Sequence, residues 1–206
     1  MLSIRTILPD TLELLKTMSS QPELQNMRLV GGTSLALQYG HRQSVDLDFF
    51  GHLQVSQEEL LQMANRIGET TIYSQSPNIL QLVINGVKVD IVNYSCYEWI
   101  DEPVVEEGIV LASPKDIAAL KINAIEGRGT KKDFVDMFLL LQHYDLESIL
   151  QFYKQKYPNH SEFRALLSLT YFEDADEQPM PPLFVDTTWE QMKDAIKTIV
   201  RQYQNA

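Results

Sequence analysis

The segment that decides the fold runs from Arg28 to Phe50 and reads RLVGGTSLALQYGHRQSVDLDFF. Its first three residues form an apolar-rich run that predicts a short strand, and the two glycines that follow predict a sharp turn into a short helix. Thr33 or Ser34 can cap that helix. Gly40 supplies the positive φ that ends it. The segment therefore predicts strand, turn and helix in quick succession.

The second part of this segment predicts a strand that carries two acids. Residues Val45–Phe50 alternate so that Asp46 and Asp48 share one face while their apolar neighbours share the other. Two carboxylates on one strand face repel each other unless a cation or protons neutralise them. Exposed aspartates on a loop or edge strand are common, so the pair by itself is a weak indication of a site.

A hairpin supplies a third acid. Ile79–Ile84 and Val87–Val92 are apolar-rich runs separated by Asn85-Gly86, the dipeptide that suits a type I′ turn. Asp90 lies between apolar neighbours in the second run, where an unpaired acid lowers stability. If the hairpin packs beside the first acidic strand, three carboxylates meet, and their hard oxygen ligands suit Mg²⁺ or Mn²⁺.

The turn at Gly31-Gly32-Thr33-Ser34 predicts the other half of a site. Glycines let the backbone approach a phosphate closely, and the first amides of a helix carry the positive end of its dipole. Many turns between a strand and a helix contain two glycines for steric reasons alone. The combination with the nearby acids is what indicates a nucleotide site.

The chain changes character near residue 111. Before it, short β-rich runs mix with helices, and after it almost every run has a helical pattern. We expect an α+β fold, with a core over residues 1–110 and a helical part over residues 111–206. Helices are predicted at residues 9–18, after the Ser56/Glu59 capping box, from Ser113-Pro114 to Gly127, from Thr130 to about His143, and over about residues 188–203.

Composition narrows the class of protein. No apolar run approaches the roughly 20 residues that span a bilayer, and the N-terminus lacks the features of a signal peptide. We therefore expect a cytoplasmic protein without a membrane partner. The single cysteine, Cys96, cannot form an internal disulfide, and we expect it to be buried. The net charge of −11 disfavours broad, non-specific binding of nucleic acid.

One stretch could still attract a polyanion. Five of the 17 basic residues fall in an eighteen-residue window, and they are Lys115, Lys121, Arg128, Lys131 and Lys132. A basic patch here would favour an RNA acceptor if it lay beside the site. The plainer alternative is a pair of solvated helices.

The combined motifs resemble the signature of the DNA polymerase β nucleotidyltransferase superfamily, in which Gly-Gly or Gly-Ser precedes a hydrophobic-flanked Asp-x-Asp. Thirteen residues separate Gly32 from Asp46, at the long end of that spacing. The fuller string, with His41-Arg42 and Ser44, is similar to the AbiEii/AbiGii type, the toxin component of some abortive-infection and toxin–antitoxin systems. A polymerase-β-like core followed by a helical domain that completes the cleft is the fold this resemblance implies.

The resemblance also implies roles for individual residues. The metal ligands would be Asp46, Asp48 and Asp90, the triphosphate would meet Gly31, Gly32, Thr33 and Ser34, and Lys121 would neutralise phosphate charge. Asp133 or Asp136 would complete the site, with proton acceptance as one role open to them. His41 and Arg42 could contact phosphate or simply bond to loop carbonyls. Asp133 also lies three residues after Thr130, where a capping box would explain it.

The implied activity is metal-dependent transfer of a nucleoside monophosphate from a nucleoside triphosphate to an RNA, such as a tRNA, or to a protein. A cognate antitoxin is a further possible partner. Two alternatives stay open. The first is a regulatory or nucleotide-binding module that keeps the fold without the chemistry. The second is an acidic interaction protein, which would leave Asp90 unexplained.

Overall fold

The computed structural model describes residues 1–205, and they group into two compact units. Unit 1 comprises Met1–Glu98 and Glu102–Ala112, and unit 2 comprises Trp99–Asp101 and residues 113–205. The change of character predicted near residue 111 lies beside this division. Neither unit contains a helix long and apolar enough to cross a membrane, within the described residues.

Unit 1 is built around one mixed sheet with helices. Its elements in chain order are η1 (Ile4–Thr6), α1 (Pro9–Ser19), η2 (Pro22–Leu24), β1 (Met27–Leu29), α2 (Gly31–Tyr39), β2 (Leu47–Gly51), α3 (Gln57–Ile67), β3 (Thr70–Ser76), β4 (Ile79–Ile84), β5 (Val87–Asn93), β6 (Val104–Glu106) and β7 (Ile109–Leu111).

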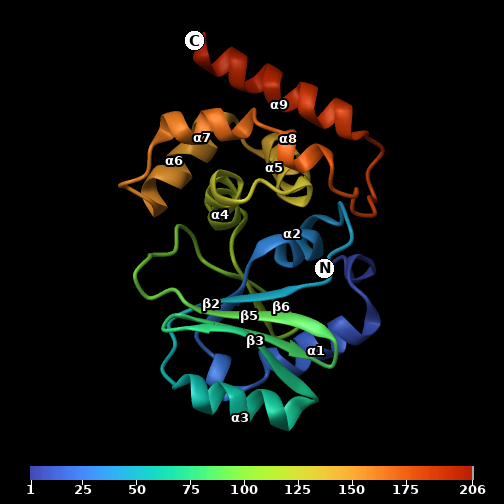
Figure 1. Cartoon of the computed structure of the whole chain (residues 1–206), viewed down its shortest axis with the longest axis vertical. Coiled ribbons are helices and arrows are strands. Elements are labelled where there is room, and N and C mark those ends of the chain that lie inside the picture. Colours follow the sequence, from blue (N-terminus) through green and yellow to red (C-terminus); the bar gives the residue numbers. More distant parts are fainter. Residues whose placement is uncertain (206) are drawn as a thin grey trace. The chain divides into compact units, whose positions relative to one another are not determined.

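Seven strands within the described residues form this sheet, in the order β3-β4-β5-β2-β1-β7-β6. The pairs β2/β5 and β1/β7 are parallel, and the other neighbours are antiparallel. Helices α1 and α3 lie on one side of the sheet, and α2 lies on the other (Figure 1). The sheet of unit 1 therefore has two differently covered faces.

Side-chain alternation decides which residues meet which face. Leu47 and Phe49 of β2 are buried, as are Val89 and Ile91 of β5, and all four belong to the core formed with α1 and α3. Because successive side chains of a strand point to opposite faces, Asp48 and Asp90 lie on the face toward α2. Both are only partly exposed.

Several sequence predictions for unit 1 are confirmed. The hairpin β4/β5 turns at Asn85 and Gly86, whose φ values of 49° and 81° match a type I′ turn. The capping box of α3 is present, with Ser56 and Glu59 bonded reciprocally. Gly40 ends α2 with φ 72°.

Other details of the prediction were wrong. Helix α2 begins at Gly31 with Val30 as its N-cap, and neither Thr33 nor Ser34 caps it. The reason is that the Val30 amide donates to the Asp48 carbonyl (2.8 Å), so the extended backbone reaches Val30 and no further. Strand β2 begins at Leu47, and the predicted position Val45 lies outside it and half exposed.

Three strands of unit 1 were not predicted from the sequence. Strand β3 is a polar edge strand exposed along almost its whole length, so it lacks the alternation that marks a half-buried strand. Strands β6 and β7 have three residues each, too few for a periodic signal. Cys96, expected to be buried, is exposed in the segment after β5.

Unit 2 is a helical bundle. Its elements are α4 (Pro114–Gly127), α5 (Lys131–His143), α6 (Leu146–Lys156), α7 (Glu162–Leu169), α8 (Glu173–Asp176) and α9 (Trp189–Gln204). Ser113 caps α4, and the predicted Thr130/Asp133 capping box starts α5. Phe134 of α5 packs against Phe172 and Trp189 at ring-centroid distances of 4.7 and 6.1 Å.

A buried ion pair ties Trp99–Asp101 to this bundle. The Lys156 ammonium lies 2.8 Å from Asp116 Oδ1, and both side chains are fully buried. The amide of Ile100 also donates to Asp116 Oδ1 (2.8 Å), and Lys156 lies 4.9 Å from the centre of the Trp99 ring. These bonds explain why the short segment belongs to unit 2.

Candidate active site

The two strand carboxylates lie side by side. Strands β2 and β5 are parallel neighbours, and Asp48 is the register partner of Asp90. Register partners on adjacent strands share a face and are separated by about 4.7–4.9 Å between strands. Asp46 lies two residues before Asp48, just outside β2, and is also partly exposed. The predicted packing of the hairpin beside the first acidic strand is therefore confirmed.

Gly31 lies directly against Asp48. Its φ is +69°, and a Cβ atom at this position would lie 2.4 Å from Asp48 Oδ2. Only a residue without a side chain lets the start of α2 come this close to the carboxylate. The N–H groups of the first helical turn have no acceptor within the helix. Helix α2 thus begins next to the acids with amides that can bind an anion.

Thr33 links the helix to the acidic loop. Its side chain is buried, and its hydroxyl is hydrogen-bonded to the Asp46 carbonyl oxygen and to the Ser44 hydroxyl (2.8 Å). The Ser34 hydroxyl is also buried, and it accepts a hydrogen bond from Gln38 (3.2 Å). Both hydroxyls are therefore engaged in hydrogen bonds within unit 1. Backbone amides are thus better placed than the hydroxyls to meet a phosphate.

The loop before β2 is also tied down. Arg42 is buried, and its guanidinium donates to the Gln43 carbonyl oxygen (2.8 Å). His41 is buried as well. The bond of Arg42 matches the simpler of the two predicted roles, in which these residues stabilise the loop. Their predicted contact with phosphate stays a prediction.

The two oxygens of Asp90 have different surroundings. Oδ2 accepts a hydrogen bond from the Gln81 side-chain amide (2.8 Å) and lies 3.6 Å from the Lys88 ammonium. Oδ1 is buried, and no described residue donates a hydrogen bond to it. Sequence reasoning overlooked Gln81. Pairing outward from the two-residue turn places Gln81 opposite Asp90, so the hairpin register could have identified it.

These features fit a hard divalent cation. Carboxylate oxygens are the ligands that Mg²⁺ and Mn²⁺ prefer, and a buried carboxylate oxygen without a donor is a position where a cation would be favourable. The described residues contain no preassembled group of three or more His, Cys, Asp or Glu side chains in metal-binding positions. Like-charged carboxylates repel one another, so a complete ligand group is not expected without the cation.

The predicted residues of unit 2 form a buried cluster of ion pairs. The Lys121 ammonium lies 2.9 Å from Asp133 Oδ1 and 2.6 Å from Asp136 Oδ2. All three side chains are almost completely buried, so Lys121 does not lie on the solvated helix surface that was the plainer alternative for the basic window. The Arg128 guanidinium binds both oxygens of Asp133, at 2.9 and 3.0 Å. The capping box explains Asp133, and the ion pair explains Asp136.

The surroundings of Asp133 determine its protonation. Burial alone would raise the pKa of this carboxyl, but Lys121, Arg128 and the Thr130 hydroxyl outweigh it and hold the pKa well below its usual value. A carboxylate with so low a proton affinity is poorly suited to act as a general base. The cluster is therefore better suited to holding α4 against α5.

The candidate basic window is only partly exposed to solvent. Two of its five members, Lys121 and Lys131, are buried. Lys115 pairs with Asp101 (2.7 Å), and Arg128 pairs with Asp133. The window therefore gives no support for an RNA acceptor.

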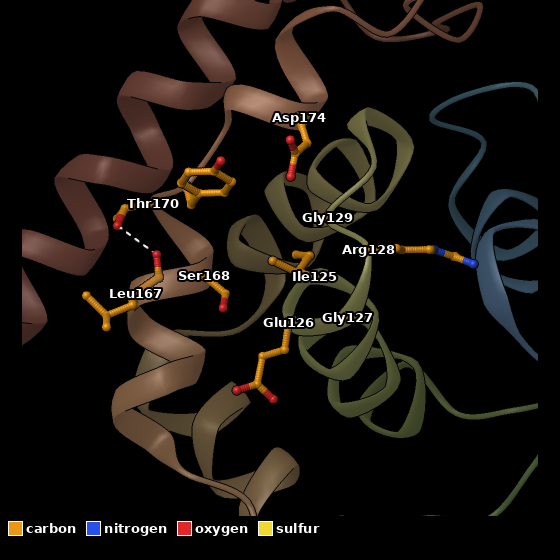
Figure 2. A pocket seen from close by; sticks show the side chains of 10 residues that line it. Ile125, Glu126, Gly127, Arg128, Gly129, Leu167, Ser168, Thr170 and Asp174 are labelled. Carbon is orange, nitrogen blue, oxygen red and sulfur yellow. Dashed lines mark hydrogen bonds between the residues drawn. The ribbon is translucent and has the colours of Figure 1, made fainter.

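A hollow of about 520 Å³ opens in unit 2 beside the end of α4 (Figure 2). Its lining includes Glu126, Arg128, Leu167, Tyr171 and Asp174. None of the predicted metal ligands or phosphate-binding residues lines it. This hollow therefore gives no support for a second nucleotide site.

Several known proteins are similar to this chain in sequence or in fold. An uncharacterized protein of Aquifex aeolicus is 34% identical over 181 residues, which cover 85% of this chain and 86% of the relative. Among solved structures, the nucleotidyltransferase toxin MenT4 of Mycobacterium tuberculosis has a TM-score of 0.55 at 16% identity, covering 93% of this chain and 81% of MenT4. JHP933 of Helicobacter pylori has a TM-score of 0.53 at 18% identity, covering 97% and 95%.

The two structural similarities show the fold, which is that of the polymerase-β-like nucleotidyltransferases. The family comes from the sequence. The family described as nucleotidyl transferase AbiEii toxin, of type IV toxin–antitoxin systems, matches residues 13–203. This match covers nearly the whole chain, and the protein therefore belongs to the AbiEii family of nucleotidyltransferase toxins.

Proposed function

We propose that this nucleotidyltransferase moves a nucleoside monophosphate from a nucleoside triphosphate to a hydroxyl of an RNA or protein acceptor, in a reaction that needs Mg²⁺ or Mn²⁺. The acceptor hydroxyl gives up its proton to solvent and its oxygen attacks the α-phosphorus, while the bond from the α-phosphorus to the oxygen that bridges to the β-phosphorus breaks and pyrophosphate leaves. A toxin acting in this way would be controlled by a cognate antitoxin, as the toxin–antitoxin character of the family suggests.

The observation that carries the proposal is the contact between two half-sites in unit 1. Asp48 and Asp90 are register partners, and the first residue of α2 lies against Asp48. Carboxylates attract cations, and the amides at the start of a helix attract phosphates. A metal-bound triphosphate presents both charges together. It is the ligand that satisfies both half-sites at once.

Asp46, Asp48 and Asp90 would hold the metal ions, and the amides at Gly31 and Gly32 would hold phosphate oxygens. When bound, the ions would activate the attacking oxygen and stabilise charge on the leaving one. The protein would contribute mainly placement. Thr33 holds the backbone of Asp46, and the sheet holds Asp48 beside Asp90. Fixed placement of the reacting groups can account for much of the rate of such a transfer.

A direct role in nucleotidyl transfer is less well supported for Lys121, Asp133 and Asp136. Their mutual ion pairs support a role in the stability of unit 2. A contact of Lys121 with phosphate stays a prediction from the resemblance. It would require the ammonium to exchange a carboxylate for a phosphate oxygen.

The test is a transfer assay with Mg²⁺, each labelled nucleoside triphosphate, and total cellular RNA or protein as acceptor. Wild-type protein should label one acceptor class, and Asp48→Asn should not, because it removes a ligand charge at nearly constant volume. Its melting temperature should not fall, since carboxylate repulsion is relieved. Asp10→Asn, the same change at an exposed position in α1, is the matched control and should keep full activity.

Calorimetry with a non-hydrolysable nucleoside triphosphate separates the remaining outcomes. Binding that depends on Mg²⁺ and is lost in Asp48→Asn supports the proposed site. If no nucleotide and no acceptor gives transfer, and if no metal-dependent binding is seen, the proposal of an enzyme is wrong. The protein is then a regulatory module with the same fold. An early-melting Asp48→Asn variant would mean that Asp48 serves stability.

A further inference from the structure

We propose that Gln81 is a positioning residue for nucleotidyl transfer, because its side-chain amide holds one oxygen of Asp90 and turns the other toward a divalent metal ion. The inference rests on the proposed role of Asp90 as a metal ligand. Gln81 lies in the first strand of the predicted hairpin but is not among the site residues predicted from the sequence. Its place in the sheet is what connects it to the site.

Gln81 stands in a cross-strand row with the two acids. Strand β5 pairs with β2 so that Asp90 is opposite Asp48, and β4 pairs with β5 so that Gln81 is opposite Asp90. The row therefore reads Asp48, Asp90, Gln81 across three adjacent strands, on one face of the sheet. Strand β4 has a neighbour on each side, so the backbone of Gln81 is held within the sheet.

The hydrogen bond fixes the rotation of the Asp90 carboxylate. The Gln81 amide nitrogen lies 2.8 Å from Oδ2, a normal distance for a bond to a charged acceptor. The Lys88 ammonium, 3.6 Å from the same oxygen, adds attraction on that side. Both polar neighbours therefore engage Oδ2.

The other oxygen, Oδ1, is buried without a donor among the described residues. A buried acceptor without a partner is unfavourable and rare in folded proteins. Asp48, the neighbour across the row, is an acid and offers no donor when ionised. A cation bound between the two acids would satisfy Oδ1.

An uncharged amide suits this task better than a charged side chain would. A lysine at residue 81 would add a positive charge beside the acids and compete with the metal ion. A glutamate would add a further negative charge and repel Asp90. Glutamine donates to the carboxylate, whose negative charge then stays available to the cation. Partners of this kind in metal sites are worth about 10–100-fold in metal affinity or activity.

The test measures Mn²⁺ binding by the disappearance of the free-ion electron paramagnetic resonance signal, with a non-hydrolysable nucleoside triphosphate present. Gln81→Met keeps the side-chain length and removes the donor, and its Mn²⁺ affinity should fall about tenfold or more. In the transfer assay kcat should fall and the Mg²⁺ concentration for half-maximal rate should rise, with little change in KM for the nucleotide. Gln81→His keeps an N–H donor and should recover part of both losses.

The matched control is Gln75→Met in the adjacent strand β3. The Gln75 amide donates to Gln57 (2.7 Å) and not to Asp90, so the same substitution there should leave Mn²⁺ affinity and kcat unchanged. Melting temperatures of all variants check that each is folded. A Gln81→Met variant within threefold of wild type in Mn²⁺ affinity and kcat would overturn the inference, as would equal losses in Gln75→Met.

Asp90→Asn in the same titration separates this inference from the proposed function. If Asp90→Asn abolishes Mn²⁺ binding while Gln81→Met does not weaken it, the metal site stands and only the role of Gln81 fails. If Asp90→Asn binds Mn²⁺ like wild type, Asp90 is not a ligand. The ligand set of the proposed function then fails, and the role of Gln81 fails with it.

Discussion

Substituting Gly31 by alanine tests the contact on which the active site depends. The added methyl group would lie 2.4 Å from Asp48 Oδ2 and 3.3 Å from Asp48 Cγ. Ordinary van der Waals contact begins near 3.4 Å. The oxygen or the start of α2 must therefore move by about 1 Å, and a misplacement of that size can lower an enzymatic rate about 100-fold.

The backbone conformation adds a separate effect on stability. Gly31 has φ +69°, and a left-handed conformation costs an alanine about 1–2 kcal/mol. For a protein of this size, each kcal/mol lowers the melting temperature by roughly 2–4 °C. Gly31→Ala should therefore melt a few degrees below wild type and lose about 100-fold or more in kcat.

Gly40→Ala separates the two effects. Gly40 ends the same helix with φ +72°, and its added methyl group would meet the Ser3 hydroxyl oxygen at 2.8 Å, with no carboxylate among its three nearest atoms. The backbone strain is thus matched, and the disturbance of Asp48 is absent. Transfer rates with saturating Mg²⁺ and melting temperatures should be measured for both variants. If Gly31→Ala keeps a kcat within threefold of Gly40→Ala, the reasoning about Asp48 is refuted.

Two further predictions concern the buried charges of unit 2. Lys121→Met leaves Asp133 and Asp136 buried without their shared ammonium and should destabilise the protein by about 3–5 kcal/mol. Lys115→Met on the same helix removes only a solvent-exposed pair with Asp101 and should leave the melting temperature nearly unchanged. Equal melting temperatures for the two variants would contradict the buried network. Because the folded-state pKa of Asp133 is lowered from 3.8, its ionised form contributes stability that is complete above that value and is lost as the pH falls toward the folded-state pKa. Urea midpoints should therefore drop between about pH 5 and pH 2.5, and the drop should be smaller in Asp133→Asn.

Local signals were sufficient for much of the fold. A two-residue turn sets the register of a hairpin, so Asn85-Gly86 determined which residues of β4 and β5 face each other. Capping boxes likewise marked the starts of α3 and α5, because the bonds that define them join residues three apart. Such features depend on neighbours in the chain, and the sequence contains those neighbours.

Features of the fold that depend on residues far apart in the sequence were not predicted correctly. The polar strand β3 forms because it pairs with the edge of β4, and its own residues have no pattern that predicts a strand. The start of α2 was misplaced because a bond from Val30 to Asp48 decides it. The burial of Lys121 was not predicted, since only the folded bundle brings Asp133 and Asp136 around it.

The candidate site divides in the same way. The sequence by itself determined the residue types and the strand faces on which they lie. Asp46 lies just before β2, Asp48 lies within it and Asp90 lies in β5, and the two glycines stand at the start of a short helix. Only the tertiary structure decided that β5 lies parallel to β2 with Asp90 beside Asp48, and that Gly31 touches Asp48. The physical reason is that alternation is set by the covalent geometry of one strand, whereas the choice of neighbouring strand comes from burying its apolar face in a common core.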